Sequence, residues 1–195
     1  MIGSLDPQIT RLVREAQTGD QEAFAALYRH YGALVYRTAY LLLGDTGRAE
    51  ELTQDVFVRL HSRLAQYQPN RGAFTTWLHS ITVSVCLNAR RRRVLSWLSL
   101  DRASADGLEL QDQRQPPLTL ALRGEEHRRI WQAVQRLPIK LRAAVVLRYY
   151  HDMSYEEVAQ ALGCPVGTVR SRLHAAHARL RDTLQEDDDE LSADR

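Results

Sequence analysis

The sequence predicts an all-α protein of two small helical domains joined by a flexible linker. Apolar residues recur at spacings of three and four through most of the 195 residues, which is the period of an amphipathic helix. The pattern breaks over residues 96–123, where small polar residues and the run QDQRQPP indicate a linker. Such a segment is uncommon inside one compact domain. We therefore expect domains at 1–95 and 124–184, and a disordered acidic tail at 185–195.

Charge is distributed unevenly along the chain. The formal net charge is +2, from 26 basic and 24 acidic residues, and Lys140 is the only lysine. Acidic residues concentrate between Glu186 and Asp194, so the rest of the chain is more basic than the total and favours an anionic partner. No apolar run approaches the roughly 18 residues of a membrane span, and the N-terminus has no signal-peptide core. We therefore expect a cytoplasmic protein.

The first domain is expected to be a helical bundle. A helical stretch over residues 5–43, with Asp20 as a cap within it, should end at Gly44, and Asp45 should begin the next helix. That helix carries a core stripe of Ala49, Leu52, Val56, Leu60 and Leu64. The segment YQPNRG then predicts a loop, followed by a helix that begins at about Ala73 and ends in four arginines.

The second domain should begin with two helices separated by Pro138, which cannot continue a helix. The apolar stripe of the first of these helices contains Ile130, Val134 and Leu137. The stripe of the second contains Leu141, Val145, Val146 and Tyr149. Both stripes have helical spacing and should face inward.

The segment Ser154–Arg181 predicts two further helices joined by a tight turn. Ser154 and Glu157 have the spacing of a capping box, Gly163 suits a left-handed helix end, and Pro165 suits the first turn of the next helix. In the second helix, an apolar stripe should face inward: Val166, Val169, Leu173, Ala176 and Leu180. The outward face then carries Thr168, Arg170, Ser171, His174 and Arg181. This layout is typical of a helix-turn-helix that enters a DNA major groove, although a helical hairpin with a solvated basic face has the same pattern.

A second candidate site combines aromatic and basic residues. Tyr67, Phe74 and Trp77 lie in sequence among Asn70, Arg71, Thr75 and His79, and Arg90–Arg93 follow. Single-stranded nucleic acid binds such a combination, because bases stack on rings and phosphates pair with arginine. Phe74 and Trp77 are three residues apart and could instead belong to the core, more so for Phe74.

Three ordered segments give the chain a resemblance to a known family. They are AEELTQDVFVRL (Ala49–Leu60), FTTWLHSITVSVCLNARRRR (Phe74–Arg93), and the segment Leu137–Leu180, which contains SYEEVA followed by GCPVGTVRSRL. With these segments the chain resembles bacterial RNA polymerase sigma factors of the sigma-70 family, in the extracytoplasmic function (ECF) group. The resemblance implies that the first domain binds the β′ clamp helices of core RNA polymerase and opens the −10 element of promoter DNA. It implies that the second domain reads the −35 duplex and rests on the β-flap, and that the linker threads toward the active site and RNA exit channel.

The resemblance, together with helical periodicity, assigns residues to three surfaces. The core polymerase-binding surface contains Leu52, Gln54, Asp55 and Phe57. The −10 DNA-binding surface contains Tyr67, Asn70, Arg71, Phe74, Thr75, Trp77, His79, Arg90, Arg91, Arg92 and Arg93. The −35 DNA-binding surface contains Arg148, Tyr155, Glu156, Thr168, Arg170, Ser171, Arg172, His174 and His177. Arg170 is the best candidate for a base edge, whereas Arg172 points nearer the core and suits a phosphate or an intramolecular salt bridge.

The chain departs from the family pattern in two helices. The promoter-melting segment often has Arg-Asn where this chain has Val83-Ser84, and Asp where it has Asn88. The recognition helix often has Arg where this chain has Ala175 and His177. Fewer charges there suggest fewer phosphate contacts or a different promoter sequence. The resemblance also implies an anti-sigma factor as a partner.

Two other classes of function fit parts of the sequence. A plain helix-turn-helix regulator would need neither a single-strand platform nor a polymerase-binding helix. An enzyme with a Cys86 nucleophile and His79 or His61 as base would need an orienting motif, which the sequence lacks, so a buried structural cysteine is favoured. Metal binding by Cys164, His174 and His177 matches no known zinc pattern. We therefore expect no catalytic residues, metal or cofactor.

Overall fold

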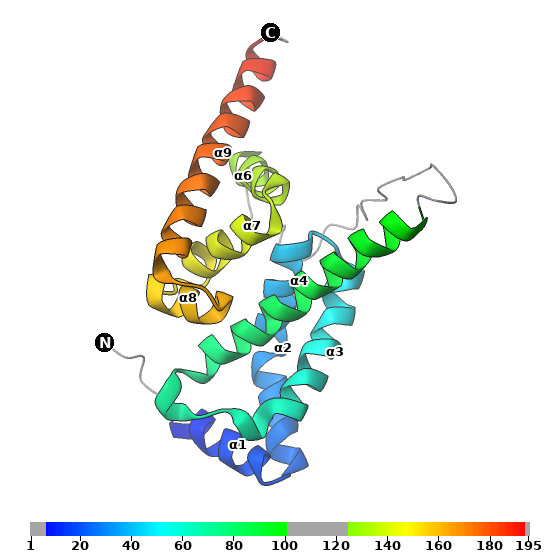
Figure 1. The fold of residues 1–195 in the computed structure, drawn as a ribbon, viewed down its shortest axis with the longest axis vertical. Coiled ribbons are helices and arrows are strands. Elements are labelled where there is room, and N and C mark those ends of the chain that lie inside the picture. Colours follow the sequence, from blue (N-terminus) through cyan, green and yellow to red (C-terminus); the bar gives the residue numbers. More distant parts are fainter. Residues whose placement is uncertain (1–6, 101–124, 194–195) are drawn as a thin grey trace.

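The protein is described by a computed structural model that covers residues 7–100 and 125–193, in which all regular structure is helical (Figure 1). The first part contains α1 (Pro7–Gln17), α2 (Gln21–Leu43), α3 (Thr46–Arg63) and α4 (Phe74–Leu100), with short helical turns at Leu64–Gln66 and Pro69–Arg71. The second part contains α6 (Glu125–Arg136), α7 (Ile139–Val145), a π-helical turn at Val146–Tyr150, α8 (Tyr155–Leu162) and α9 (Val166–Ala193). The all-α, two-domain prediction is confirmed.

Local capping signals set the helix ends of the first domain. Asp20 accepts a hydrogen bond from the backbone N–H of Ala23 at 3.0 Å and begins α2. Gly19 has a φ of +95°, and this left-handed residue separates α1 from α2, so the helical stretch expected over residues 5–43 is two helices. Gly44 ends α2 with a φ of 73°, and Asp45 caps α3 by accepting from Arg48 N–H at 2.8 Å, both as predicted.

Two helices extend further than expected. α4 continues past the four arginines to Leu100, so residues 96–100 of the expected linker are helical. α9 continues to Ala193. Residues 185–193, which were expected to form a disordered tail, are therefore helical, and the prediction is wrong for them. Neither extension contains the glycine or proline that would end a helix. The remainder of the expected linker, residues 101–123, lies outside the described residues.

Two predicted core positions of the second domain are exposed. Ile130 is 44% exposed, because the apolar contact of α6 with the first domain begins at Trp131, which stacks on Tyr40 with ring centroids 5.6 Å apart. Tyr149 is 55% exposed, since the π-helical turn changes the spacing of inward positions and directs this ring toward α9. The buried residues of this region include Ala143 and Ala144 of α7 and Leu147 of the turn that follows it.

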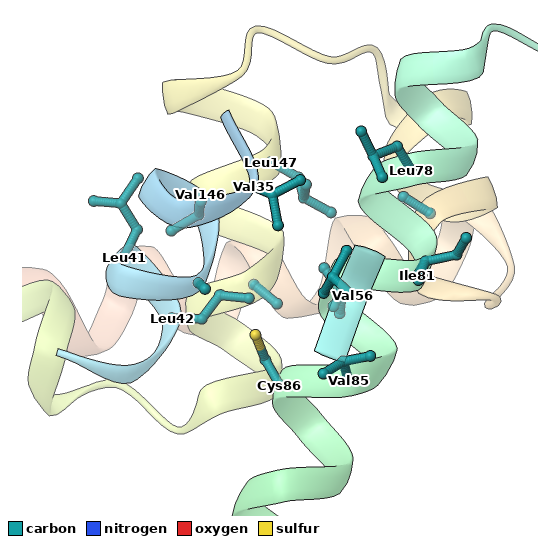
Figure 2. Packing of buried hydrophobic residues seen from close by; sticks show 14 of the residues in the cluster. Val35, Leu41, Leu42, Val56, Leu78, Ile81, Val85, Cys86, Val146 and Leu147 are labelled. Atoms are coloured by element: carbon teal, nitrogen blue, oxygen red, sulfur yellow. The ribbon is translucent and has the colours of Figure 1, made fainter. Parts of the chain in front are cut away.

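The two domains share one continuous core. Figure 2 shows Val146 and Leu147 of the second domain among Val35, Leu41 and Leu42 of α2, and these residues belong to a single buried apolar cluster. α8 packs along α4, and α7 also contacts α2 and α4. Polar and apolar contacts between the domains were not expected from the sequence, which predicted only that a linker joins them.

Candidate nucleic-acid interface

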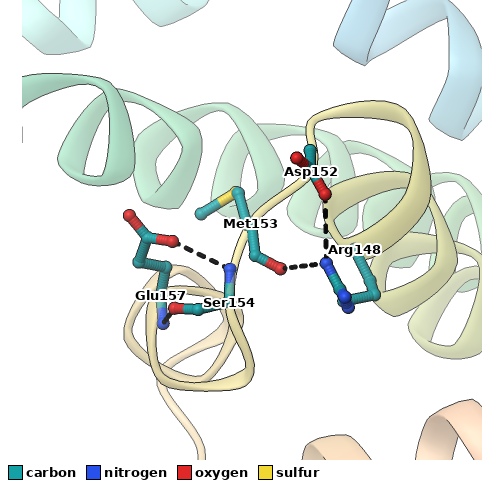
Figure 3. A network of polar contacts seen from close by, with 5 residues as sticks. All are labelled: Arg148, Asp152, Met153, Ser154 and Glu157. Carbon is teal, nitrogen blue, oxygen red and sulfur yellow. Dashed lines mark hydrogen bonds and ion pairs between the residues drawn. The ribbon is translucent and has the colours of Figure 1, made fainter. Parts of the chain in front are cut away.

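The turn before α8 is fixed by a capping box, as predicted. Ser154 N–H donates to the carboxylate of Glu157 at 2.8 Å, and Glu157 N–H donates to Ser154 Oγ at 3.2 Å (Figure 3). Gly163 ends α8 with a φ of 60°, Cys164 and Pro165 complete the turn, and α9 begins at Val166. The two helices therefore meet in the helix-turn-helix geometry that the sequence indicated.

Arg148 holds the loop that leads into this motif. Its guanidinium donates to Asp152 Oδ1 at 3.3 Å and to the carbonyl of Met153 at 3.1 Å (Figure 3). Asp152 is the one described non-glycine residue with a positive φ, 50°, so the loop has an unusual backbone for Arg148 to stabilise. The guanidinium also lies 5.8 Å from the Tyr149 ring centroid and 5.7 Å from that of Tyr155. Arg148 thus positions the helix-turn-helix through contacts with the loop that precedes α8.

The outward face of α9 is formed as expected. Arg170, Ser171 and His174 are exposed, and Thr168 is half-buried. The guanidinium of Arg170 lies 5.9 Å from the ring centroid of Tyr155, which is itself exposed at the start of α8 beside the exposed Glu156. A cation over an aromatic face is favourable and orients the side chain. The α9 side of this surface therefore presents a cation, two hydroxyls and an imidazole, and the start of α8 adds a phenol and a carboxylate.

Two residues of the predicted set are engaged inside the domain. Arg172 is half-buried, and its guanidinium lies 3.6 Å from Cys164 Sγ, so it faces the turn between the helices, as its inward direction suggested. His177 is exposed, and its Nε2 lies 2.9 Å from the Tyr149 hydroxyl. This pair joins α9 to the π-helical turn, a contact that residue spacing alone does not reveal.

The aromatic platform expected near α4 is mostly core. Tyr67 and Phe74 are buried, and their ring centroids lie 5.3 Å apart, edge to face. Tyr67 donates its hydroxyl proton to the Gly72 carbonyl at 3.0 Å, and burial raises the pKa of this phenol. Trp77 is half-buried and packs 5.2 Å from Tyr67 and 5.9 Å from Phe74. Tyr67 and Phe74 therefore cannot stack on bases in this arrangement.

The polar members of the same surface divide into two groups. Asn70, Arg71, Arg90, Arg91 and Arg92 are exposed, Thr75 is half-buried, and the side chain of Arg93 lies outside the described residues. His79 is only 3% exposed, and burial lowers its pKa to about 4. Its ring lies 4.2 Å from that of His151 in the second domain, so His79 faces the other domain instead of solvent.

The predicted polymerase-binding residues on α3 divide in the same way. Gln54 and Asp55 are exposed, and Val58, which is 71% exposed, lies one turn further along. Leu52 and Phe57 are 6% and 4% exposed and belong to the core of the first domain. Leu52 was already part of the predicted core stripe, which is the signal that separates it from Gln54 and Asp55.

Comparisons with known proteins agree with this arrangement of two domains. The family Sigma-70 region 2 matches residues 27–95, and Sigma-70, region 4 matches residues 127–180. The ECF RNA polymerase sigma-E factor of Escherichia coli K12 is 34% identical over 184 residues, which cover 89% of this chain and 93% of that protein. This chain is a member of the ECF sigma factor family. ECF RNA polymerase sigma factor SigW of Bacillus subtilis is 29% identical over 187 residues, covering 93% of this chain and all of SigW.

Two solved structures have the same fold. CnrH in complex with the cytosolic domain of CnrY has a TM-score of 0.65 at 24% identity, over 92% of this chain and 99% of CnrH. The sigma factor RpoE of Bartonella quintana, in complex with the anti-sigma factor NepR, has a TM-score of 0.64 at 20% identity, over 83% of this chain and 96% of RpoE. The region 2 match spans α2 to α4, and the region 4 match spans α6 to α9.

The cysteines of the sigma factor are the residues on which the metal-site and nucleophile alternatives depended. In the part of the chain that the structure describes, no three His, Cys, Asp or Glu side chains come together to hold a metal, so Cys164, His174 and His177 do not form a ligand set. Cys86 is fully buried, and burial raises the pKa of its thiol to about 12, which keeps it protonated and unreactive. Among the described helices, none is long and apolar enough to cross a membrane.

Proposed function

We propose that this sigma factor binds core RNA polymerase and directs it to promoters through the −35 duplex and the melted −10 strand. The observation that carries the proposal is the exposed surface of α9 and α8, where Arg170, Ser171 and His174 lie beside Tyr155 on a correctly capped helix-turn-helix. A helix of this kind enters the major groove, and its outward side chains reach base edges. No catalytic group is required for this function.

For the −35 element, Arg170 is proposed to contact a base edge. A bidentate arginine–guanine contact discriminates by about 1–3 kcal/mol. The ring of Tyr155 would orient the guanidinium of Arg170 through the cation–π contact. The rest of the −35 surface would consist of Glu156, Thr168, Ser171 and His174. His177 would contribute at its border, while Arg148 and Arg172 would act indirectly, because both are engaged with the protein's own loops.

For the −10 element, the proposed surface is narrower than the sequence suggested. Asn70, Arg71, Thr75 and the exposed part of Trp77 would contact the strand, and Arg90–Arg93 would contact backbone phosphates. The buried rings of Tyr67 and Phe74 would support this surface. Gln17 adds to that support by donating hydrogen bonds to the carbonyls of Leu64 and Tyr67, at 2.9 and 3.0 Å.

For the polymerase, the proposed contact with the β′ clamp helices is the exposed side of α3 that contains Gln54, Asp55 and Val58. Val58 is an exposed branched apolar residue, and the exposed polar residues Gln54, Asp55 and Ser62 lie three or four positions away on the same helix. This arrangement suits the apolar centre of a protein interface with a polar rim. Leu52 and Phe57 would hold α3 in place from the core. The second domain would rest on the β-flap, and the linker would run toward the active site and RNA exit channel.

We also propose an anti-sigma factor as a partner, because the structures of RpoE and CnrH are complexes, with the anti-sigma factor NepR in the first and with the cytosolic domain of CnrY in the second. The protein would act in the cytoplasm, where polymerase and DNA are found.

Co-purification with core polymerase tests the proposal against a plain operator-binding regulator. Affinity-tagged protein is mixed with core polymerase lacking any sigma factor, and the complex is challenged with an unlabelled ECF sigma factor. We expect the polymerase to be retained and then displaced by the competitor. Retention of duplex DNA without retention of core polymerase would contradict the proposal and support an operator-binding regulator.

A further inference from the structure

We propose that the second domain closes on the first and covers the promoter-melting helix α4, and that the stacked pair His79–His151 makes this closure sensitive to protonation. The covered face includes the loop at Arg71, whose carbonyl accepts a hydrogen bond from Gln160. The proposed function assigns Arg71 to the −10 surface, so the biological meaning of closure rests on that function. The closure itself rests only on contacts between named residues of the two domains.

The end of α2 is one anchor of the closed arrangement. The last carbonyls of a helix lack partners within the helix. Here Arg142 donates to the Leu42 carbonyl at 2.8 Å, and Gln135 Nε2 donates to the Leu41 carbonyl at 3.0 Å. Gly44 permits this approach, since a Cβ there would lie 2.7 Å from Gln135 Oε1. Two side chains of the second domain therefore complete the hydrogen bonding of a helix in the first.

The loop before α4 is a second anchor. Gln160 of α8 donates a hydrogen bond from Nε2 to the Arg71 carbonyl at 2.9 Å. The adjacent Gly72 has a φ of 148°, and a Cβ at this position would lie 2.7 Å from Gln160 Nε2. α8 thus lies against both α4 and the loop Asn70–Gly72 that belongs to the proposed −10 surface.

The histidine pair lies between these two anchors. The ring centroids of His79 in α4 and His151 after the π-helical turn are 4.2 Å apart. His151 Nε2 lies 2.9 Å from Thr38 Oγ1, and Thr38 donates its own hydroxyl proton to the Leu34 carbonyl at 2.7 Å. His151 Nε2–H must then be the donor to Thr38. His79 Nδ1 is buried without a hydrogen-bond partner, so a proton placed on it would have no acceptor.

The surroundings of the pair offer no compensation for a positive charge. His151 faces Arg37 and Thr38 from α2 and His79 from α4, and the ring of its neighbour Tyr150 lies edge to face at 4.9 Å. Within the described part of the chain, neither ring forms an ion pair with a carboxylate. Burial lowers the pKa of His79 to about 4. Burial, then His79, then Arg37 lower that of His151 to about 3.

The direction of the pH effect follows from linkage. In an open form both rings would be exposed and would titrate near the ordinary histidine value of about 6.5. Above that pH both forms carry neutral rings, and the closed form keeps its full stability. As the pH falls from about 6.5 toward the lowered values, only the open form binds the protons. The closed-to-open ratio then falls about tenfold per pH unit for each histidine.

The test measures the distance between the domains in the full-length protein, without polymerase or DNA. Fluorescent donor and acceptor labels are placed at Ser62→Cys on α3 and Ala178→Cys on α9, both exposed positions, in a Cys164→Ser background. Cys86 is fully buried and should not react. Energy transfer is followed from pH 7.5 to 4.0, and only the pH values at which circular dichroism shows unchanged helix content are used. We expect a short distance at pH 7.5 and an opening transition below pH 6.5.

Three variants separate the histidine pair from general acid effects. His79→Phe/His151→Phe should stay closed throughout the range. The control His127→Phe, at an exposed histidine of α6, should open as the unaltered chain does. Thr38→Val removes the hydrogen bond to His151 and should open at a higher pH, so it tests the pair even if the double variant does not fold. A long distance at pH 7.5, or an unchanged one down to pH 4.0, would overturn the proposal, whatever the protein does with polymerase.

Discussion

Arg142 donates a hydrogen bond to the backbone carbonyl of Leu42 at 2.8 Å, and through it a cation of the second domain caps a helix of the first. The same guanidinium donates to Gln135 Oε1 at 2.6 Å, to the Gln135 carbonyl and to the Leu137 carbonyl at 3.0 Å. Burial, with a smaller contribution from Arg90, lowers the pKa of Arg142 to about 10, so it stays charged at neutral pH. The charge is held by carbonyl dipoles instead of a carboxylate.

Replacing Arg142 with leucine should strongly destabilise the fold. The substitution leaves buried carbonyls without donors, and each such group costs about 1–3 kcal/mol. We expect urea unfolding to show a loss of at least about 2 kcal/mol. Arg179→Leu on the exposed side of α9 is the matched control and should change the unfolding free energy by less than about 0.5 kcal/mol. Equal effects of the two substitutions would contradict the assigned role of Arg142.

Ser154→Ala should weaken the second domain through its helix cap. Loss of the hydrogen bond from Glu157 N–H to Ser154 Oγ removes one half of the capping box. A cap of this kind contributes about 1 kcal/mol. Thermal unfolding should report that loss for Ser154→Ala and almost none for Ser62→Ala, an exposed serine of α3 whose hydroxyl donates to Arg59. A Ser154→Ala variant as stable as the original chain would argue against the capping box.

Sequence alone predicted the features that depend on neighbouring residues. The capping box at Ser154, the left-handed Gly44 and Gly163, and the stripe from Ala49 to Leu64 all follow from local spacing, and the structure confirms each. Contacts between distant residues could not be predicted, because helical periodicity gives the buried side of a helix but not what covers it. Thr38 and His151, for example, are 113 residues apart and yet hydrogen-bonded.

The candidate site shows the same limit at Tyr67, Phe74 and His79. These residues fit a nucleic-acid platform by composition, whereas their burial depends on α8 and on the packing of the first domain. The outward face of α9 was predicted well, because its inward stripe is regular and the helix is covered on one side only. Arg142 was missed because a buried arginine has no apolar signature in the sequence.

Arg170→Ala should relax recognition of the −35 element at one base pair without loss of fold. If Arg170 reaches a base edge, selection from randomised −35 duplexes should show a loss of about 1–3 kcal/mol of discrimination at a single position. Arg179→Ala removes an exposed cation from the same helix and should leave the selected sequence unchanged. An identical sequence preference for Arg170→Ala would remove this residue from the proposed contacts.

Asp55→Lys combined with Val58→Asp should weaken binding to core polymerase while the fold is preserved, because both side chains are exposed. We expect at least a tenfold rise in the dissociation constant, which corresponds to about 1.4 kcal/mol. Glu22→Lys on α2 makes the same charge change as Asp55→Lys at another exposed site and serves as the control. Leu52→Ala should instead unfold the first domain more easily, by about 2–5 kcal/mol. Unchanged affinity of the double variant would exclude this side of α3 as the polymerase contact.

Run-off transcription with purified core polymerase tests the central claim most directly. Fragments of the genome that encodes this protein serve as templates, and core polymerase is used with and without it. We expect discrete transcripts that require the protein, begin downstream of a shared −35 and −10 pair, and decline when Arg170→Ala replaces the original chain. Core polymerase that gains no promoter-specific transcript from any fragment would contradict the central claim.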